Sequence, residues 1–306
     1  MTVRNETQII VFCYEPHDLV DSLCIKLPAI EGRINTRSFP DGESYLRIET
    51  PVEGSDCIIL ADLSHPNNKF LPFVFLAATL RELGASSVGL LAPYLSYMRQ
   101  DRRFIEGEAV TSRIFAKQLS QQVDWLVTVD PHLHRYHSLD EIYDIPCHVV
   151  QGASALAGWL KGQEKMFLVG PDAESEQWVS EIAAHSGHPF IIGAKQRYGD
   201  QDVVVTLPDL ARFQGYTAMI IDDVISSGQT ILKCIEALKT QGINSIKCAA
   251  VHGIFANDID QVLIESGLTQ LITTNTIPHL SNRMDIADLL LEPVLECVRV
   301  ARESKP

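Results

Sequence analysis

The side chains best suited to chemistry lie together in Ile220–Thr230. An apolar strand runs into two carboxylates, Asp222 and Asp223, and a loop of small polar residues then leads into a helix. Ligands of open α/β sheets bind beyond the carboxyl ends of the strands, so this phrase predicts a binding site. The loop can offer amides and hydroxyls to a phosphate at the helix N-terminus, from Ser226, Ser227, Gly228, Gln229 and Thr230. The carboxylates would repel that phosphate, but they can accept hydrogen bonds from sugar hydroxyls. A 5-phosphorylated ribose therefore fits both the loop and the carboxylates.

Two common nucleotide-binding patterns are absent from the sequence. It has neither the Walker spacing Gly-x4-Gly-Lys-Ser/Thr nor the Gly-x-Gly-x-x-Gly fingerprint, so ordinary P-loop and dinucleotide sites lack support. The alternative interpretation of Ile220–Thr230 is a capped helix after an acidic strand end. The complete phrase disfavours that alternative.

Two segments in the first half offer groups suited to a nucleotide. The Phe39 ring can stack on adenine, while Asp41 and Glu43 can accept hydrogen bonds from its exocyclic amine. The alternative is an ordinary turn, because Pro-Asp-Gly is a common turn sequence. Arg99 and Gln100 suit a polyphosphate, since guanidinium binds phosphate bidentately, and the alternative there is a solvated basic turn.

Short Val/Ile/Leu runs alternate with segments of helical period, which predicts parallel sheets covered by helices. Helices are expected over Phe70–Leu83 and Thr230–Thr240, each followed by a glycine. Thr36–Ile48 and Ala194–Thr206 break the rhythm and are expected to be flaps or hairpins. The predicted strands are Ile9–Phe12, Cys57–Leu60, Val88–Leu91, Trp125–Val129, Met166–Val169, Phe190–Ile192, Ala218–Ile221, Ile246–Val251 and Gln270–Thr273.

An internal repeat divides the chain. A strand, a helix and a glycine-initiated strand follow one another from Cys57 to Pro93 and again from Met219 to Val251. The alternative is coincidence, because α/β proteins reuse such strand–helix phrases. The repeat and a length of 306 residues predict two domains related by pseudo-symmetry, 1–150 and 151–306.

Composition excludes several classes of protein. The net charge is −14, which argues against a nucleic-acid or membrane-surface binder, and no apolar stretch is long enough for a transmembrane helix. The seven cysteines have no zinc or redox spacing, and most lie in apolar runs. With no visible signal peptide, a reduced cytoplasmic protein is expected.

The phrase Ile220–Thr230 resembles the phosphoribosyl-pyrophosphate loop shared by type I phosphoribosyltransferases and ribose-phosphate pyrophosphokinases. Other segments resemble motifs of the ribose-phosphate pyrophosphokinases, in the same order as in that family and over nearly the whole chain. They are Phe39–Glu43, Pro93–Arg102, Asp130–His132, Pro171–Ala173, Lys195–Arg197, His252–Phe255 and Asn275–Pro278. The resemblance implies an α/β fold of two type I phosphoribosyltransferase-like domains, each a mainly parallel sheet flanked by helices.

The resemblance also implies site roles. Lys195 and Arg197 would supply positive charge during pyrophosphoryl transfer and are the expected catalytic residues, the alternative being plain solvated charge. Asp101 would join the nucleotide site. His132, also expected at the nucleotide, and Asp172, also expected at the ribose phosphate, would hold a magnesium ion. The alternative for Asp172 is the N-cap of a following helix.

The implied reaction is that of a ribose-phosphate diphosphokinase of nucleotide biosynthesis. The 1-hydroxyl of ribose 5-phosphate attacks the β-phosphorus of ATP and AMP is released. A homo-oligomer with its nucleotide site near a subunit interface is expected. The alternatives are a phosphoribosyltransferase that uses the sugar loop alone, or a catalytically silent homologue that regulates a true synthetase.

Three departures separate this chain from the common bacterial and animal pattern. Ser226 replaces an acidic residue, as in archaeal-type members, and Glu174 and Glu176 occupy the region of a glycine pair. The chain also ends at Pro306 without the terminal Ser-Tyr/Ser-Leu-Phe type of tail. This last departure predicts weak or absent activation by phosphate and inhibition by ADP.

Overall fold

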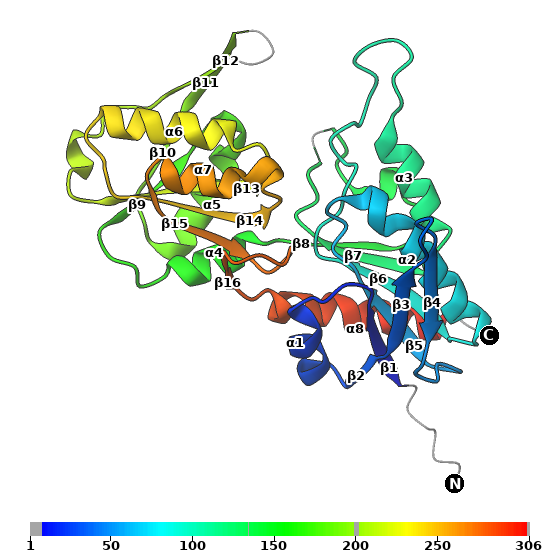
Figure 1. The fold of residues 1–306 in the computed structure, drawn as a ribbon. Coiled ribbons are helices and arrows are strands. Elements are labelled where there is room, and N and C mark those ends of the chain that lie inside the picture. Colours follow the sequence, from blue (N-terminus) through cyan, green and yellow to red (C-terminus); the bar gives the residue numbers. More distant parts are fainter. Residues whose placement is uncertain (1–7, 134, 199–201, 305–306) are drawn as a thin grey trace. The chain divides into compact units, whose positions relative to one another are not determined.

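The computed structural model describes residues 8–133, 135–198 and 202–304, and for 195–198 and 202–203 it describes the backbone alone. The chain divides into two compact units (Figure 1). Unit 1 contains the chain up to Gln151 together with the segment from Ala287 onward. Unit 2 contains Gly152–Ile286.

Unit 1 is a six-stranded parallel sheet with helices on both faces. Its strands in spatial order are β2 (Ala29–Gly32), β1 (Ile9–Cys13), β5 (Asp56–Leu60), β6 (Ser87–Ala92), β7 (Trp125–Val129) and β8 (Cys147–Val150). Its helices are α1 (Leu19–Lys26), α2 (Pro66–Glu82), α3 (Thr111–Ser120) and α8 (Ala287–Glu303). α2 and α3 bury their apolar stripes against one face, and α1 and α8 pack together on the other. The central strands are buried on both sides, which is why they appear in the sequence as continuous apolar runs.

Unit 2 repeats this plan. Its strands in spatial order are β10 (Phe190–Ile192), β9 (Met166–Gly170), β13 (Thr217–Ile225), β14 (Ile246–Gly253), β15 (Leu268–Thr274) and β16 (Asn282–Met284). Its helices are α4 (Ala153–Leu160), α5 (Glu176–Ser186), α6 (Gln229–Thr240) and α7 (Ile259–Glu265). α6 and α7 close one hydrophobic core, and α4 packs against α5.

The two strand orders match position by position, so the predicted repeat is confirmed. In both units the second strand is followed by an antiparallel hairpin: β3 (Ile34–Ser38) with β4 (Ser44–Ile48), and β11 (Ala194–Tyr198) with β12 (Asp202–Thr206). These hairpins are the two segments that break the strand–helix rhythm of the sequence. The expected α/β fold of two parallel sheets flanked by helices is therefore present.

The helix that follows the last strand of each sheet along the chain packs in the other unit. α4 follows β8 of unit 1 along the chain but packs in unit 2, and α8 follows β16 of unit 2 but packs in unit 1. α8 buries Leu290, Val294, Cys297 and Val298 on one stripe, and it contacts α1, β6, β7 and β8. The sequence expectation of a domain over 151–306 differs from the structure at 287–306, because this stripe is buried in unit 1.

The structure also extends the predicted strands. β13 continues to Ile225 instead of ending at Ile221, since β14 runs beside it as far as Gly253. Asp222 and Asp223 therefore lie within the strand and not after it. β2, β8 and β16 were not predicted, because they are short strands with few buried residues.

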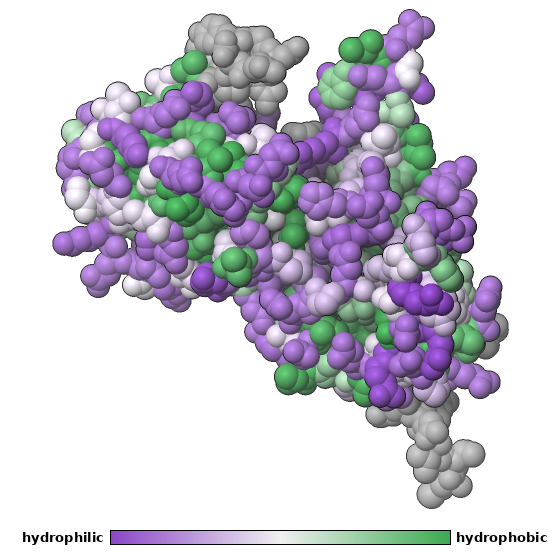
Figure 2. Space-filling model, viewed as in Figure 1, coloured by the Kyte–Doolittle hydropathy of each residue, from purple (hydrophilic) through white to green (hydrophobic). Residues whose placement is uncertain are grey.

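The surface offers few other features. Hydrophilic residues predominate on the face shown in Figure 2, and hydrophobic ones are scattered among them. No helix in the described part of the chain has the length and apolar character needed to cross a membrane.

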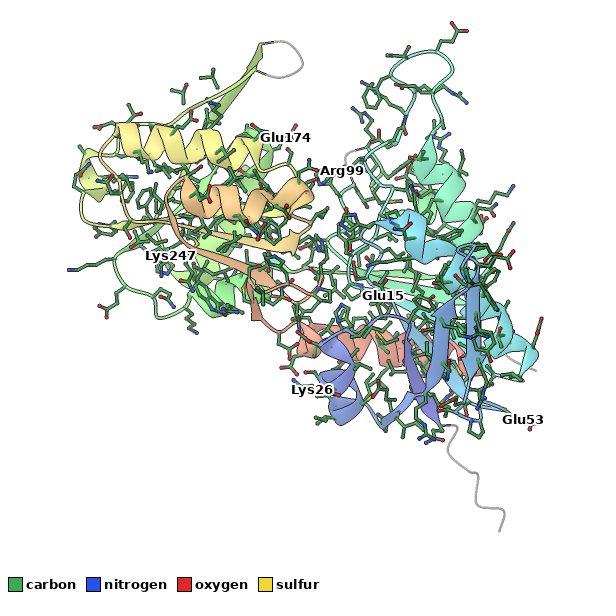
Figure 3. The ribbon with its side chains drawn as sticks, in the orientation of Figure 1. Glu15, Lys26, Glu53, Arg99, Glu174 and Lys247 are labelled. Atoms are coloured by element: carbon green, nitrogen blue, oxygen red, sulfur yellow. The ribbon has the colours of Figure 1, made fainter. Side chains whose placement is uncertain are left out.

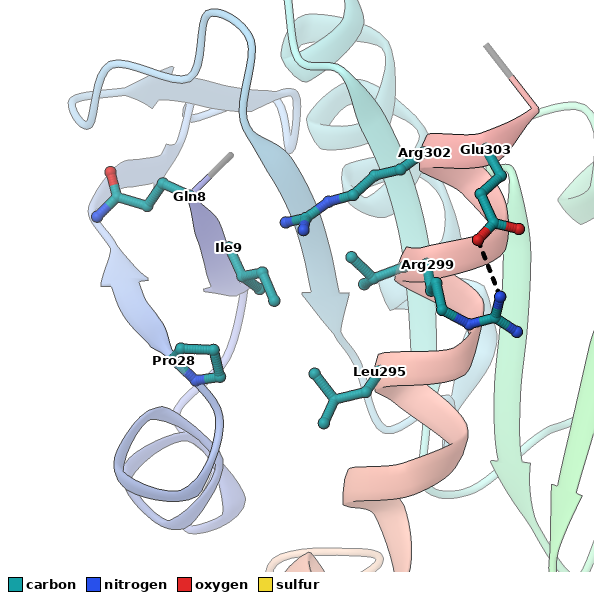
Figure 4. A pocket seen from close by; sticks show the side chains of 8 residues that line it. Gln8, Ile9, Pro28, Leu295, Arg299, Arg302 and Glu303 are labelled. Atoms are coloured by element: carbon teal, nitrogen blue, oxygen red, sulfur yellow. Dashed lines mark hydrogen bonds and ion pairs between the residues drawn. The ribbon is translucent and has the colours of Figure 1, made fainter. Parts of the chain in front are cut away.

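A cavity of about 810 Å³ lies in unit 1, at the amino ends of β1 and β2 beside the end of α8 (Figure 4). None of the predicted site residues lines it.

Candidate active site

The predicted phosphate loop forms a tight turn between β13 and α6 in unit 2. Gly228 is the residue before α6, with a φ of 65°, a left-handed conformation that favours glycine. A Cβ there would lie 2.4 Å from Cγ1 of Ile259 in α7, so the turn also requires the absence of a side chain. The amides in the first turn of α6 have no intrahelical acceptor and form the N-terminal donor group that a phosphate can use.

A neighbouring loop supports this turn. The amides of Ile254 and Phe255 donate to the carbonyl of Ile225 over 2.9 and 3.1 Å, and the amide of Ala256 donates to Ser226 O over 3.1 Å. Phe255 adopts a left-handed conformation with a φ of 49°. The loop after β14 therefore fixes the carbonyls at the start of the phosphate loop.

The two carboxylates of β13 lie next to each other. Asp222 Oδ1 accepts from the amide of Asp223 at 3.0 Å, and Asp223 Oδ1 accepts from the amide of Val224 at 2.8 Å. Burial raises the pKa of Asp222 well above its ordinary value, and the charges of Asp223 and Asp172 raise it further. Three carboxylates thus influence one another at this edge of unit 2, and a bound cation or donating sugar hydroxyls would stabilise their ionised forms.

Asp172 follows β9 and makes the contacts of an N-cap. Its Oδ1 accepts from the amides of Glu174 at 3.1 Å and Ser175 at 3.3 Å. Its influence on the pKa of Asp222 places it at the same edge. Glu174 is exposed in the next turn (Figure 3). The capping contact weighed from the sequence is thus present, and metal binding by Asp172 stays a prediction.

His132 lies in unit 1, in the segment that follows β7. It is half-buried, and the chain turns at Asp130 with a φ of 34°. Across the described residues, no group of three or more His, Cys, Asp or Glu side chains is arranged to hold a metal. Metal binding by His132 therefore stays a prediction.

The predicted nucleotide residues Phe39, Asp41 and Glu43 form the tip of the β3–β4 hairpin. Phe39 O accepts from the amide of Gly42 at 2.9 Å, and the amide of Phe39 donates to Glu43 O at 2.7 Å. Gly42 has a φ of 91°, which suits the left-handed residue after a type I turn. Asp41 Oδ1 accepts from the amide of Glu43 at 3.2 Å, and all three side chains are exposed. The expected turn is therefore present and leaves the three groups accessible.

The loop after β6 carries the predicted residues Arg99, Gln100 and Asp101, which differ from one another in exposure. Arg99 is exposed (Figure 3), and Gln100 Oε1 accepts from the hydroxyl of Thr111 at 3.3 Å. The side chain of Asp101 is buried, and its Oδ1 lies 2.6 Å from Nη1 of Arg135. Asp101 therefore fixes the loop through an internal ion pair in this structure, and its contact with a nucleotide stays a prediction.

Lys195 and Arg197 lie in strand β11 of the second hairpin, paired in register with Val205 and Val203. Their side chains lie outside the described part of the structure. Their catalytic role therefore stays a prediction.

Comparison with known proteins assigns the chain to a family. Residues 9–122 match the family model of the N-terminal domain of ribose phosphate pyrophosphokinase, and residues 138–277 match that of the phosphoribosyl transferase domain. A ribose-phosphate pyrophosphokinase of Sulfolobus acidocaldarius is 31% identical over 84% of this chain and 89% of its own length. The chain belongs to the ribose-phosphate pyrophosphokinase family. The Saccharolobus solfataricus family member is 32% identical over 83% of this chain and 87% of its own length.

The solved structures confirm the fold of the family. The crystal structure of phosphoribosylpyrophosphate synthetase from Mycobacterium smegmatis has a TM-score of 0.81 to this chain, at 24% identity. The match covers 96% of this chain and 100% of that one. Two phosphoribosyltransferase-like units, predicted from the repeat and the motifs, are thus the fold of this family member.

Sequence reasoning missed two arginines next to the predicted residues of this pyrophosphokinase-family chain. Arg135 holds Asp101, but 34 residues separate them, and no local pattern connects the two. Arg37 precedes Phe39 by two residues, and its guanidinium lies 4.6 Å from the centre of the Phe39 ring. Strand alternation at the start of the hairpin was the available signal for Arg37, because residues two apart share a face.

Proposed function

We propose that this protein transfers the β,γ-pyrophosphoryl group of ATP to the 1-hydroxyl of ribose 5-phosphate, giving 5-phosphoribosyl 1-pyrophosphate and AMP. The observation that carries the proposal is the β13–α6 turn, a phosphate cradle beside two carboxylates, within a chain of this family. The curated relatives are named for this activity. A transferase using the sugar loop alone would leave the first unit's nucleotide motifs without a role.

The ribose phosphate would bind at the carboxyl edge of unit 2. Amides and hydroxyls of the turn would hold the 5-phosphate, with Ser226, Ser227, Gly228, Gln229 and Thr230 contributing. Asp222 and Asp223 would accept hydrogen bonds from the ribose hydroxyls. The raised pKa of Asp222 supports this assignment, because hydroxyl donors stabilise a carboxylate that burial and like charge destabilise.

The nucleotide would bind through Phe39, Asp41 and Glu43 at the hairpin tip and through Arg99, Gln100, Asp101 and His132 in the loops after β6 and β7. In the reaction, the oxygen of the 1-hydroxyl forms a bond to the β-phosphorus of ATP and loses its proton. The bond from that phosphorus to the oxygen bridging the α-phosphorus breaks, and AMP leaves with that oxygen. Lys195 and Arg197 would neutralise the charge that develops between these oxygens.

A magnesium ion fits the chemistry of these residues. Magnesium prefers oxygen ligands and is usually held by one or two carboxylates together with substrate phosphates. Asp172 offers such a carboxylate at the edge where its charge and that of Asp223 raise the pKa of Asp222, and His132 would be the second protein ligand. When bound, the ion would neutralise charge on the ATP phosphates. The protein residues would orient the two substrates.

Three further expectations belong to this proposal. A homo-oligomer would place the nucleotide site near a subunit interface, and the protein would act in the cytoplasm without nucleic acid or membrane partners. Activation by phosphate and inhibition by ADP would be weak or absent. A titration of activity with phosphate that shows strong activation would contradict this last expectation.

The deciding experiment follows AMP formation from ATP, magnesium and ribose 5-phosphate with purified protein. We expect AMP to appear only when all three are present, and the Lys195→Ala and Arg197→Ala variants to lose at least about 100-fold in kcat. Absence of AMP with correctly folded protein would contradict the proposal. Pyrophosphate release from phosphoribosyl pyrophosphate that depends on a base would instead indicate a phosphoribosyltransferase.

A further inference from the structure

A group of one arginine and two aromatic rings lies near the tip of the β3–β4 hairpin, with Arg37 and Phe39 exposed and Tyr45 partly buried. Arg37 and Tyr45 are directly opposite each other in the antiparallel register, and Phe39 follows on the same side of the hairpin. The Arg37 guanidinium lies 4.6 Å from the centre of each ring. The rings meet edge to face, with centres 6.4 Å apart and planes at 86°. We call these three residues the hairpin-tip group.

The opposite side of the hairpin packs against unit 1. Ile34, Leu46 and Ile48 alternate with the hairpin-tip residues and pack against the core of unit 1 beneath α2 and α3. The tip itself is closed by the Phe39–Gly42 turn. The hairpin is thus anchored on one side and presents the hairpin-tip group on the other.

The hairpin-tip group is not needed to complete a core. Phe39 is 37% exposed, and Arg37 makes no ion pair with any described residue, although the chain carries a net charge of −14. A guanidinium stacked on aromatic faces restrains the rings without covering them completely. One side of the Phe39 ring is therefore held by Arg37, and its remaining exposed surface is available for a ligand.

We propose that Arg37 and Tyr45 are positioning residues of the nucleotide site, which hold the Phe39 ring in the orientation that stacks on the purine of ATP. This inference rests on the proposed function and extends it to two residues outside the predicted site. Holding the ring in place before binding reduces the entropy lost when the nucleotide docks. The guanidinium also withdraws electron density from the ring, which favours stacking on an electron-rich aminopurine.

The test measures steady-state kinetics of Arg37→Ala, Arg37→Lys and Tyr45→Leu. For Arg37→Ala and Tyr45→Leu we expect the KM for ATP to rise about five- to tenfold, with kcat and the KM for ribose 5-phosphate within about twofold of wild type. Arg37→Lys retains a cation and should recover most of the affinity. Arg47→Ala is the matched control, because Arg47 lies on the same hairpin and pairs with Glu49 at 3.3 Å, outside the hairpin-tip group. It should leave the KM for ATP unchanged.

Inhibition by tripolyphosphate separates positioning from direct phosphate binding. Tripolyphosphate has no base, so Arg37→Ala should leave its inhibition constant unchanged. An equal rise in that constant and in the KM for ATP would show that Arg37 binds phosphate, and it would overturn the proposal. An unchanged KM for ATP would also overturn it, as would a changed oligomeric mass that accounts for the kinetic defect.

Direct ATP binding, measured by calorimetry without ribose 5-phosphate, keeps this inference distinct from the proposed function. If wild-type protein forms no AMP but binds ATP more tightly than Arg37→Ala does, the proposed reaction fails and the positioning role stands. If both proteins bind ATP equally, the positioning role fails whatever the reaction.

Discussion

The turns that follow β5 and β13 occupy the same place in the strand order of their units, yet their chemistry differs. Near the end of β13, two adjacent carboxylates precede the small residues of the turn, and the pKa of Asp222 is raised. After β5, the carboxylate of Asp62 is buried and lies 2.6 Å from the ammonium of Lys69 in α2. The same ammonium lies 3.1 Å from Glu15. Unit 1 thus neutralises its carboxylate with its own cation.

This difference lies in the residues of two turns that have similar backbones. Both turns end on a left-handed residue before a helix, His65 with a φ of 51° and Gly228 with a φ of 65°. In unit 1, internal bonds to Asp62 from Lys69 and from the amide of Ser64 satisfy the turn. In unit 2, the adjacent carboxylates of Asp222 and Asp223 instead raise the pKa of Asp222. The two turns therefore differ in the chemistry of their residues although they share one place in the strand order.

The largest effect is expected from removing the internal cation of unit 1. Lys69→Met leaves the buried Asp62 without its partner and should lower the free energy of unfolding by about 3 kcal/mol. Urea denaturation measures this change, and Lys69→Met combined with Asp62→Asn should recover part of it. Lys233→Met is the control, because Lys233 pairs with Glu236 on the exposed side of α6. Equal losses for Lys69→Met and Lys233→Met would remove the distinction drawn between the two turns.

The second effect concerns the shape of the unit 2 turn. Gly228→Ala forces a Cβ against Ile259 and should raise the KM for ribose 5-phosphate at least about tenfold while lowering stability by about 2 kcal/mol. Kinetics and thermal unfolding measure the two effects. Gly54→Ala is the matched control, since Gly54 has a φ of 69° and a Cβ added there would have open space around it. It should lose about 1 kcal/mol of stability from backbone strain alone and keep its affinity for ribose 5-phosphate. A tight-binding Gly228→Ala variant would show that the close approach is not required.

The smallest effect is expected from the charge of Asp222. Its pKa is raised in the folded protein, so the folded state binds more protons than the unfolded state between the ordinary and the raised value. Stability should therefore fall as pH rises through that interval. Asp222→Asn should flatten this fall and raise Tm at neutral pH by a few degrees, about 1 kcal/mol, while lowering activity.

Thermal unfolding of the substrate-free protein from pH 4 to pH 8 checks the pH dependence. Glu174→Gln removes an exposed carboxylate from the same edge and should leave the pH dependence unchanged. An identical pH profile in wild type and Asp222→Asn would show that this carboxylate is not the source of the instability.

Much of this architecture follows from local sequence. The central strands β5, β6 and β7 are apolar throughout, and the repeat of strand, helix and glycine predicts two matching sheets. β16 was not predicted, because two of its three residues are polar and only Met284 is buried. The unit that each terminal helix joins could not be predicted either. An apolar stripe such as that of α8 shows that a helix is covered, but not which sheet covers it.

The candidate site likewise combines features that local sequence predicts with features that depend on contacts between distant residues. Ligands bind at the carboxyl ends of parallel strands, so the place of the phosphate loop follows from its sequence. The burial of Asp101 against Arg135 depends on two loops meeting in space, and sequence spacing does not reveal it. The electrostatic effect of Asp172 on Asp222 likewise requires the neighbouring ends of β9 and β13.

The exchange of α4 and α8 has a consequence for the order in which the protein can fold during synthesis. Every strand of the unit 1 sheet has left the ribosome once residue 150 emerges, but the helix that covers one of its faces is made last. Until then Trp125, Val127 and other residues of that face lack their final cover. During synthesis, one face of the unit 1 sheet therefore stays incompletely covered until α8 has been made. Cutting the gene near codon 150 would therefore yield a first fragment that lacks α8 and a second fragment that carries this helix without the sheet it covers.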